Sequence, residues 1–214
     1  MRSERVTATA PEAEALASYA ETLAALAAAE QADGWLVECM EARRFLALSA
    51  PFVDALAQAL GRLDELPLLE ICAGDGSLAA ALGCRGIAVI ATDRRPASRT
   101  KTAVERRAAD DALRRYRARV VLGSFVPVDS PVDQQVLDAS DVRHYVVLNA
   151  RLGGQLGARC LWTRPGWRRR PLEQVTRWMI CRHDVWLGPN RPPLTHGEAW
   201  LLSRTEERSA NAVP

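Results

Sequence analysis

The sequence predicts an α/β fold, in which helices alternate with the strands of a mostly parallel sheet and antiparallel strands close it. From residue 66 onward, apolar runs of strand length are separated by glycine turns and short helical segments, a pattern typical of parallel sheets. Residues 177–187 and 198–204 instead alternate apolar and polar side chains, which is typical of antiparallel strands. Residues 1–62 are mainly helical in pattern.

The length and composition place the chain among ordinary globular proteins. Its 214 residues correspond to one domain with a small appendage. Hydrophobic residues make up 48% and charged residues 25%, which excludes disordered and fibrous classes. No apolar run reaches the roughly 18 residues of a membrane span, and Pro11, Glu12 and Glu14 stand where a signal peptide would be apolar. We therefore expect a soluble cytoplasmic protein with no membrane partner.

The cysteines predict neither disulfides nor a metal site. Five are present, widely spaced and without a C-x-x-C pair, namely Cys39, Cys72, Cys84, Cys160 and Cys181. An odd, scattered set of this kind is typical of reduced thiols in a cytosolic protein, most of them small buried hydrophobic residues.

Three helices are expected before the sheet begins. Residues 11–30 are rich in alanine with leucines at helical spacing, and residues 35–48 form a second helical pattern after Gly34. Ser49-Ala-Pro51 is a start signal for a third helix that runs to about Leu60. We interpret residues 1–62 as an N-terminal helical cap and residues 63–214 as the α/β core.

The core is expected to hold five strands before the closing pair. These are residues 66–72, 86–92, 103–107, 119–125 and 144–149, with helices at 77–82 and 110–117.

A glycine turn and an acidic residue point to a nucleoside-bearing cofactor. In the run Glu70-Ile-Cys-Ala-Gly-Asp-Gly76, a strand reaches a helix through Gly74-x-Gly76, where no Cβ keeps a ligand from the backbone. Asp93 ends the next strand, 19 residues after Gly74. Ligands of open α/β sheets bind beyond the carboxyl ends of the strands, where this acid is placed to accept hydrogen bonds from both ribose hydroxyls.

The acid that precedes the turn decides between cofactor classes. Glu70 would put a negative charge near a pyrophosphate, which disfavours a nicotinamide dinucleotide, although Ala79 is permitted at the third glycine position of that fingerprint. The same charge suits a sulfonium cofactor with an ammonium group on its amino acid tail. The run from Glu70 to Gly76 resembles motif I of class I S-adenosylmethionine-dependent methyltransferases. One departure is that the first glycine of the family is Cys72 here, followed by Ala73.

The resemblance implies a fold, a cofactor and a set of binding residues. The fold would be a Rossmann-like, mostly parallel seven-stranded sheet with an antiparallel closing strand, and the cofactor S-adenosyl-L-methionine. Asp93 matches the ribose-binding acid, Asp110 lies where an acid would reach the adenine amino group, and Ser124 to Asp129 correspond to motif IV. The implied cofactor-binding residues are Glu70, Cys72, Ala73, Gly74, Gly76, Asp93, Arg94, Asp110, Ser124 and Phe125.

For methyl transfer, a protein positions the cofactor and the acceptor and, for some nucleophiles, supplies a base. His183 stands beside Asp184 near a strand that would line the site, and Asp129 and Tyr145 are further candidates. The residues do not decide among these three catalytic candidates.

The acceptor is expected to be a small molecule of specialised metabolism, anionic or aromatic. Residues 140–191 hold 10 basic and 3 acidic side chains, with Arg164 and Arg168–Arg170 among tryptophans. Since the chain has 27 arginines and one lysine, biased composition explains this segment equally well. Nucleic acid is not expected, because no RNA-binding pattern is present. The alternatives are an RNA or protein methyltransferase, and a methyltransferase-like fold with a binding or non-methylating function. The cap also offers a face through which two copies would form a homodimer.

Overall fold

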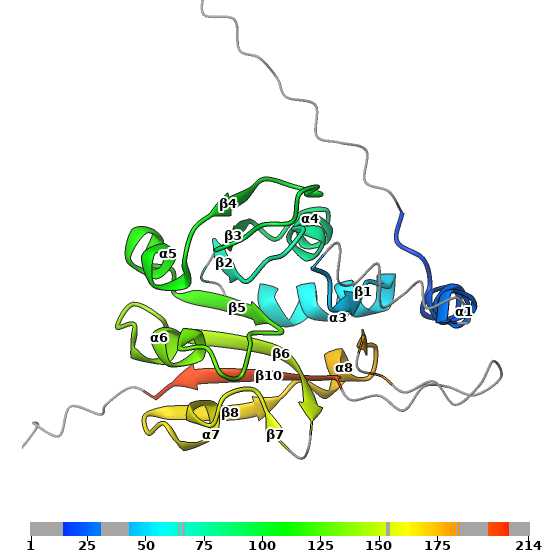
Figure 1. Ribbon diagram of the computed structural model, residues 1–214. Helices are drawn as coiled ribbons and strands as arrows, with labels where there is room; N and C mark the ends of the chain where they lie inside the picture. Colours follow the sequence, from blue (N-terminus) through cyan, green and yellow to red (C-terminus); the bar gives the residue numbers. More distant parts are fainter. Residues whose placement is uncertain are drawn as a thin grey trace, which may run out of the picture.

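The computed structural model describes residues 15–30, 43–63, 65, 67–152, 155–182, 184 and 197–205. The helices are α1 (Tyr19–Glu30), α3 (Ala50–Gly61), α4 (Ser77–Gly83), α5 (Ala109–Tyr116), α6 (Val132–Asp138), α7 (Cys160–Thr163) and α8 (Glu173–Thr176). The strands are β1 (Leu46–Ala47), β2 (Leu68–Ile71), β3 (Val89–Asp93), β4 (Val104–Arg106), β5 (Val120–Ser124), β6 (His144–Leu152), β7 (Gln155–Leu156), β8 (Trp167–Pro171), β9 (Ile180–Cys181) and β10 (Gly197–Arg204) (Figure 1).

Seven strands of the main sheet lie in the order β4-β3-β2-β5-β6-β10-β8, and β7 pairs with β6 off this path. The first five are parallel to one another, and β10 is antiparallel to both of its neighbours. In chain order the first five strands are therefore arranged 3-2-1-4-5, as in doubly wound folds. The prediction of a Rossmann-like, mostly parallel sheet with an antiparallel closing strand is confirmed.

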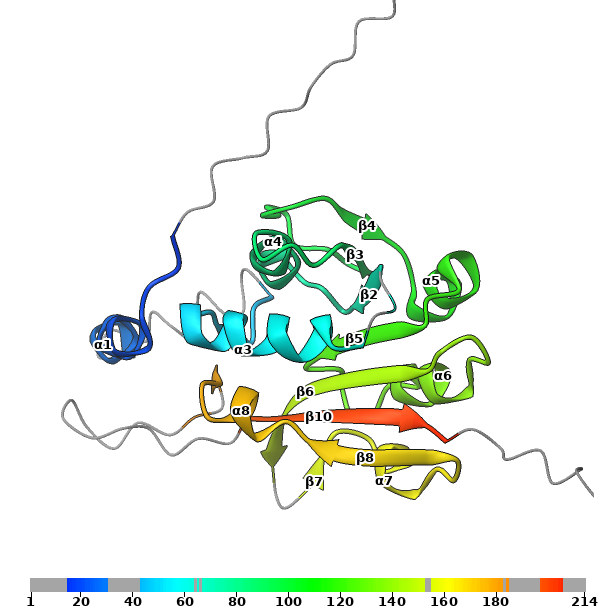
Figure 2. The ribbon, with the colours of Figure 1, turned by 180° about the vertical axis from the view of Figure 1, so that it is seen from behind.

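Helices cover both faces of this sheet (Figures 1 and 2). One core cluster joins α3, α4 and α8 to the sheet, through residues such as Leu56, Leu82 and Val175. The other cluster joins α5, α6 and α7 to the opposite face, through residues such as Leu113 and Leu137. Because both faces are buried, the central strands read as continuous apolar runs in the sequence.

Helix α3 begins as the sequence predicts, with Ser49 as N-cap and Pro51 in the first turn. Its apolar stripe includes Phe52, Val53 and Leu56, which are fully buried against the sheet. Helix α3 thus belongs to the layer that covers one face, shown toward the viewer in Figure 2. The boundary at residue 62 between a cap and a core stays a prediction.

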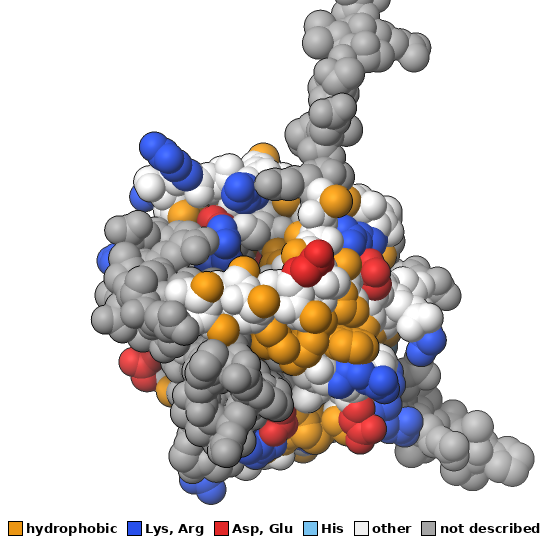
Figure 3. All heavy atoms as spheres, turned by 90° about the vertical axis from the view of Figure 1, so that its right-hand side faces the viewer, with side chains coloured by type: hydrophobic (Ala, Val, Ile, Leu, Met, Phe, Trp, Pro, Cys, Tyr) orange, Lys and Arg blue, Asp and Glu red, His pale blue; other side chains and the backbone are white. Residues whose placement is uncertain are grey.

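Helix α1 joins the rest of the protein through a small cluster. Leu26 contacts Ala47 and Ile180, and Tyr19 packs edge-on against Trp178 with ring centroids 5.2 Å apart. On this side of the molecule, hydrophobic side chains gather in the middle of the face with charged ones around them (Figure 3). Within the described ranges, no helix combines the length and apolarity that a membrane crossing requires.

The helix expected over residues 35–48 is wrong at its C-terminal end; residues 35–42 lie outside the described part. Residues 46 and 47 form β1, which pairs antiparallel with β9. Leu46 is buried in the cluster around α3, whereas Ala47 is buried against α1. Successive side chains of a strand point to opposite faces, so only an extended backbone places these two neighbours in different clusters.

The expected pairing of residues 177–187 with 198–204 is also wrong. Strand β10 pairs with β6 and with β8, while β9 pairs with β1. Strand β8 has the sequence Trp-Arg-Arg-Arg-Pro and lies at the edge of the sheet. Edge strands tolerate charged residues and proline, so β8 lacks the apolar alternation by which strands are identified from sequence.

Candidate functional site

The candidate site begins with the turn between β2 and α4. Cys72, Gly74 and Gly76 all have left-handed backbones, with φ of +57°, +59° and +73°. The turn is closed by a hydrogen bond of 2.8 Å from the Gly76 amide to the Ala73 carbonyl. A Cβ on Gly76 would lie 2.7 Å from the Val104 side chain, so the helix can pack closely on β4 only with glycine there. The expected sequence of strand, glycine turn and helix is confirmed.

Asp93 lies at the end of β3 and is hydrogen-bonded to this turn. Its Oδ2 accepts from the Gly74 amide at 3.0 Å, and its Oδ1 accepts from the Arg95 amide at 2.7 Å. The structure thus brings together the acid and the glycine that the sequence places 19 residues apart. A carboxylate offers about four acceptor positions, so two remain for hydroxyl groups of a ligand.

Glu70 is a buried acid with an unsatisfied oxygen. Its side chain is 1% exposed, and its Oε2 has no hydrogen-bond partner among the described residues. Burial, together with the negative charges of Asp75 and Asp93, raises the pKa of Glu70 to about 8. A buried polar atom without a partner is costly and rare in native proteins. Glu70 therefore suits a ligand that brings a hydrogen-bond donor or a positive charge.

A small cavity adjoins Glu70. Cys72, Ala73 and Ser124 line it together with residues of the segment 43–48, and its volume is about 30 Å³. This is about the volume that one water molecule takes up in liquid water, whereas sites for small-molecule ligands typically measure about 300–1,000 Å³. A nucleoside-sized ligand therefore requires the covering segment to move.

The covering segment, residues 43–48, lies directly against the glycine turn. A Cβ on Gly74 would come within 2.5 Å of the Arg43 carbonyl oxygen. The segment can therefore pack this closely on the turn only because residue 74 has no side chain. Arg44 forms an ion pair of 2.9 Å with Asp75, and only 6% of the Asp75 side chain is exposed. Arg43 also donates to the Arg95 carbonyl at 2.8 Å.

An aromatic stack extends from this segment across the carboxyl edge of the sheet. Phe45 stacks on Phe125 with ring centroids 5.5 Å apart and an interplanar angle of 17°. The Arg182 guanidinium lies 4.1 Å from the centre of the Phe45 ring. Phe125 has a left-handed backbone (φ +51°), and its amide donates to the Leu148 carbonyl at 2.8 Å. Phe125 is therefore fixed in position directly after β5.

Of the ten predicted cofactor-binding residues, Glu70, Cys72, Ala73 and Ser124 line the cavity and the other six do not. Arg94 and Asp110 also lie apart from the glycine turn. Arg94 follows Asp93 but is exposed. Asp110 lies in the first turn of α5, where Arg114 donates to it at 3.0 Å. This hydrogen bond lowers the pKa of Asp110.

Asp129 and Tyr145, the two catalytic candidates within the described residues, do not line the cavity. Asp129 is exposed in the turn after β5. Tyr145 is fully buried and donates a 2.6 Å hydrogen bond to Asp133, and burial raises its pKa well above the ordinary value. His183 lies outside the described residues.

The tryptophans and arginines near the C-terminus serve mainly to pack and to hold loops. Trp162 and Trp200 meet edge to face with centroids 4.9 Å apart. Arg169 donates to three main-chain carbonyl groups at 2.5–2.7 Å, those of Leu161, Arg164 and Trp167. Arg168 and Arg170 are exposed on the edge strand β8.

The aromatic stack was not predicted from the sequence. Phe45 and Phe125 are 80 positions apart, and no local pattern links them. Phe125 is among the predicted cofactor-binding residues, whereas its partner Phe45, Arg182 and the ion-paired Asp75 were missed.

Comparisons with known proteins give distant structural neighbours alone. No protein-family model and no curated protein matches the sequence. The 23S rRNA methyltransferase ErmE has a TM-score of 0.45 and 16% identity, over 76% of this chain and 70% of that chain. Magnesium protoporphyrin IX methyltransferase (ChlM) from Synechocystis PCC 6803 with bound SAM has a TM-score of 0.44 and 13% sequence identity, over 72% of this chain and 78% of that chain. The 1,6-didemethyltoxoflavin-N1-methyltransferase of Burkholderia thailandensis has a TM-score of 0.46 and 12% sequence identity, over 95% of this chain and 94% of that chain.

Proposed function

We propose that this protein is an S-adenosylmethionine-dependent methyltransferase that acts on a small molecule. The observation on which the proposal rests is Glu70, whose Oε2 finds no hydrogen-bond partner in the described part of the chain and lies beside a left-handed turn at the carboxyl edge of a doubly wound sheet. A free amino acid tail brings an ammonium group, which offers both the donor and the charge that this oxygen lacks.

The charge of the site supports this cofactor over a dinucleotide. Glu70, Asp75 and Asp93 lie on or next to the turn, and Arg44 is paired with one of them. Asp93 would repel a pyrophosphate at this place, and an anion there would also oppose the ionisation of Glu70, whereas a cationic sulfonium compound with an ammonium group would be attracted by Asp93 and would favour the ionised form of Glu70.

Each residue of the site has a distinct role in the proposal. Asp93 would accept hydrogen bonds from the ribose hydroxyls through its remaining acceptor positions, and the turn would lie along the cofactor. The bound cofactor would supply an electrophilic methyl group. Phe45 and Phe125 would then exclude water from the edge of the site, which favours a displacement at carbon.

The distribution of basic residues supports a small acceptor. Arg169 is hydrogen-bonded to carbonyl groups, and Arg151 is paired with Glu198. Of the described arginines in residues 140–191, Arg182 contacts Phe45 beside the cavity, whereas Arg151, Arg164 and Arg169 are held by partners and do not line it. The placement in specialised metabolism, in the cytoplasm and in a homodimer follows from the sequence expectations and belongs to the same proposal.

A second candidate function is binding without methyl transfer. It is favoured by the cavity of about 30 Å³ and by the position of Asp129 and Tyr145 away from it. Incubation with S-adenosylmethionine labelled on its methyl group, together with cell-derived small molecules or RNA, separates the candidates. Label in a small molecule supports the main proposal, label in RNA contradicts its acceptor, and binding without transfer supports the second candidate.

Calorimetric titration with S-adenosylhomocysteine tests the cofactor. We expect saturable binding that Asp93→Ala weakens by about 5- to 150-fold, because two hydrogen bonds of about 0.5–1.5 kcal/mol each are lost. Asp93→Asn, which keeps one acceptor oxygen, should weaken binding less. Asp129→Ala is the matched control, since it removes an exposed acid from the same edge of the sheet and should leave the affinity unchanged. Absence of binding by the wild-type protein would sink the proposal.

A further inference from the structure

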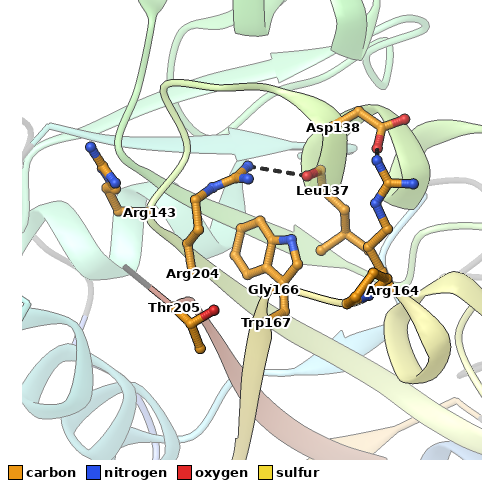
Figure 4. A pocket seen from close by; sticks show the side chains of 9 residues that line it. Leu137, Asp138, Arg143, Arg164, Gly166, Trp167, Arg204 and Thr205 are labelled. Carbon is orange, nitrogen blue, oxygen red and sulfur yellow. Dashed lines mark hydrogen bonds and ion pairs between the residues drawn. The ribbon is translucent and has the colours of Figure 1, made fainter. Parts of the chain in front are cut away.

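A second cavity, of about 700 Å³, lies at the opposite edge of the sheet (Figure 4). Its walls come from the start of β6, the end of β10 and the start of β8, through Arg143, Arg204 and Trp167. The Arg143 amide donates to the carbonyl of Arg119, the residue before β5, so the cavity is at the amino ends of the parallel strands. The length of β5, about 13 Å at 3.3 Å per residue, separates this edge from Ser124.

Arg204 contributes a positive charge that forms no ion pair with a carboxylate among the described residues. Its guanidinium donates to the carbonyl groups of Leu137, Ala139 and Val142 at 2.8–3.1 Å. It also lies over the Trp167 ring, 4.6 Å from the centre. These partners are uncharged and hold the side chain in place. Burial lowers the pKa of Arg204, and the positive charges of Arg143 and Arg164 lower it further.

Two more arginines stand on either side of Arg204 and Trp167 (Figure 4). Arg164 forms an ion pair with Asp138, the one acid among the described residues that line the cavity. Arg143 is exposed, and within the described part of the chain its side chain has no ion-pair or hydrogen-bond partner. Among the described residues that line the cavity, three arginines and one aspartate leave an excess of two positive charges.

We propose that this cavity binds a small phosphate-bearing ligand. Arginine guanidinium groups match the geometry of phosphate oxygens, and a doubly charged phosphate would balance the two excess charges. The cavity volume lies within the range of small-molecule sites. Trp167 is 5% exposed and already covered by Arg204, so its ring is closed to stacking by a nucleobase. This favours a compact phosphate compound over a nucleic acid strand.

Calorimetry with inorganic pyrophosphate tests the proposal. We expect one saturable site, and Arg143→Gln should weaken binding by about tenfold or more, because a charge-assisted hydrogen bond is lost. Arg204 is left unchanged, since it also holds three main-chain carbonyl groups. Arg177→Gln is the control, because it removes the same charge from an exposed position outside the cavity and should change the affinity less than about twofold.

Three results would overturn the proposal. The first is no saturable binding at millimolar pyrophosphate, and the second is equal weakening by both variants, which would indicate diffuse attraction. The third is binding of a single-stranded RNA oligonucleotide that is sensitive to Arg143→Gln while pyrophosphate does not bind. Excess S-adenosylhomocysteine should leave the pyrophosphate affinity unchanged, and displacement would show that the two sites are not separate. The proposed methyltransferase function stands or falls independently of these results.

Discussion

At the scale of single residues, Glu70 links the stability of the fold to the candidate site. Its ordinary pKa of 4.5 is raised to about 8 in the folded protein, chiefly by burial. Between these two values the folded protein holds a proton that the unfolded chain has released. The free energy of unfolding therefore decreases as the pH rises through this window, by up to about 1.4 kcal/mol per pH unit.

Replacing Glu70 with glutamine should remove this dependence, because the amide does not titrate. Urea unfolding at pH 5 and pH 8 should show that Glu70→Gln gains stability over the wild type mainly at pH 8. Glu173→Gln, on the exposed first turn of α8, is the control and should leave the wild-type pH dependence intact. Parallel pH profiles for the wild type and Glu70→Gln would contradict the prediction.

Cys72 occupies a position at which the backbone requires a left-handed conformation, with φ +57°. Such a conformation costs a residue with a Cβ roughly 1–2 kcal/mol. Cys72→Gly should therefore change the free energy of unfolding by less than about 1 kcal/mol, since relief of strain offsets lost packing and added chain entropy. Cys72→Val should lower it by about 1–3 kcal/mol, because a β-branched residue fits this conformation poorly.

Chemical denaturation of the two Cys72 variants provides the measurement. Cys84→Val is the matched control, since Cys84 is exposed and has an ordinary φ of −64°. A valine at position 72 as stable as the wild type would show that the turn is not strained.

At the scale of elements, the covering segment and α3 have different tasks. Residues 43–48 contact the glycine turn through an ion pair and stack on Phe125 after β5, and the two-residue strand β1 pairs with β9. Such a short pairing opens more readily than the main sheet. Helix α3, by contrast, buries a full apolar stripe against the sheet. Residues 43–48 are thus suited to admit a ligand, whereas α3 holds the sheet in place.

Truncating the buried stripe of α3 should strongly destabilise the protein. Leu56 is fully buried, so Leu56→Ala is expected to lower the free energy of unfolding by about 2–5 kcal/mol. Gln58→Ala, on the exposed side of the same helix, should change it by less than about 0.5 kcal/mol. Equal effects in urea unfolding would mean that α3 does not pack as described.

At the scale of the whole molecule, one sheet separates two core clusters and presents two distinct edges. The carboxyl edge holds the acids and the glycine turn, whereas the amino edge holds the arginine-lined cavity. The sheet thus separates groups that attract opposite charges.

Amide hydrogen exchange should follow the strand order of this sheet. The central strands β2, β5 and β6 are covered on both faces and paired on both sides, so they should exchange most slowly. The edge strands β4 and β8 should exchange faster, and the β1–β9 pair fastest. Mass spectrometry of peptides from the exchanged protein measures this order. Protection of β8 equal to that of β5 would argue against its place at the edge.

Local sequence predicted the elements whose burial is uniform. Strands β2, β5 and β6 are apolar because both of their faces are covered, and α3 has both a start signal and a periodic stripe. Gly74 and Asp93 were placed together because they follow neighbouring parallel strands. The position of Phe45 against Phe125 was not predictable, since it depends on how two distant segments fold over the same edge.

The sequence by itself determined the alternation of strands and helices, the glycine turn and the acids around it, because hydrophobic period and backbone freedom are properties of neighbouring residues. The tertiary structure alone decided that β8 and not residues 177–187 pairs with β10, that residues 43–48 close over the turn, and that Tyr145 is buried on Asp133. These outcomes depend on which surfaces remain uncovered once the sheet has formed. Which segments cover those surfaces depends on contacts across the whole chain, and a local sequence pattern does not predict such contacts.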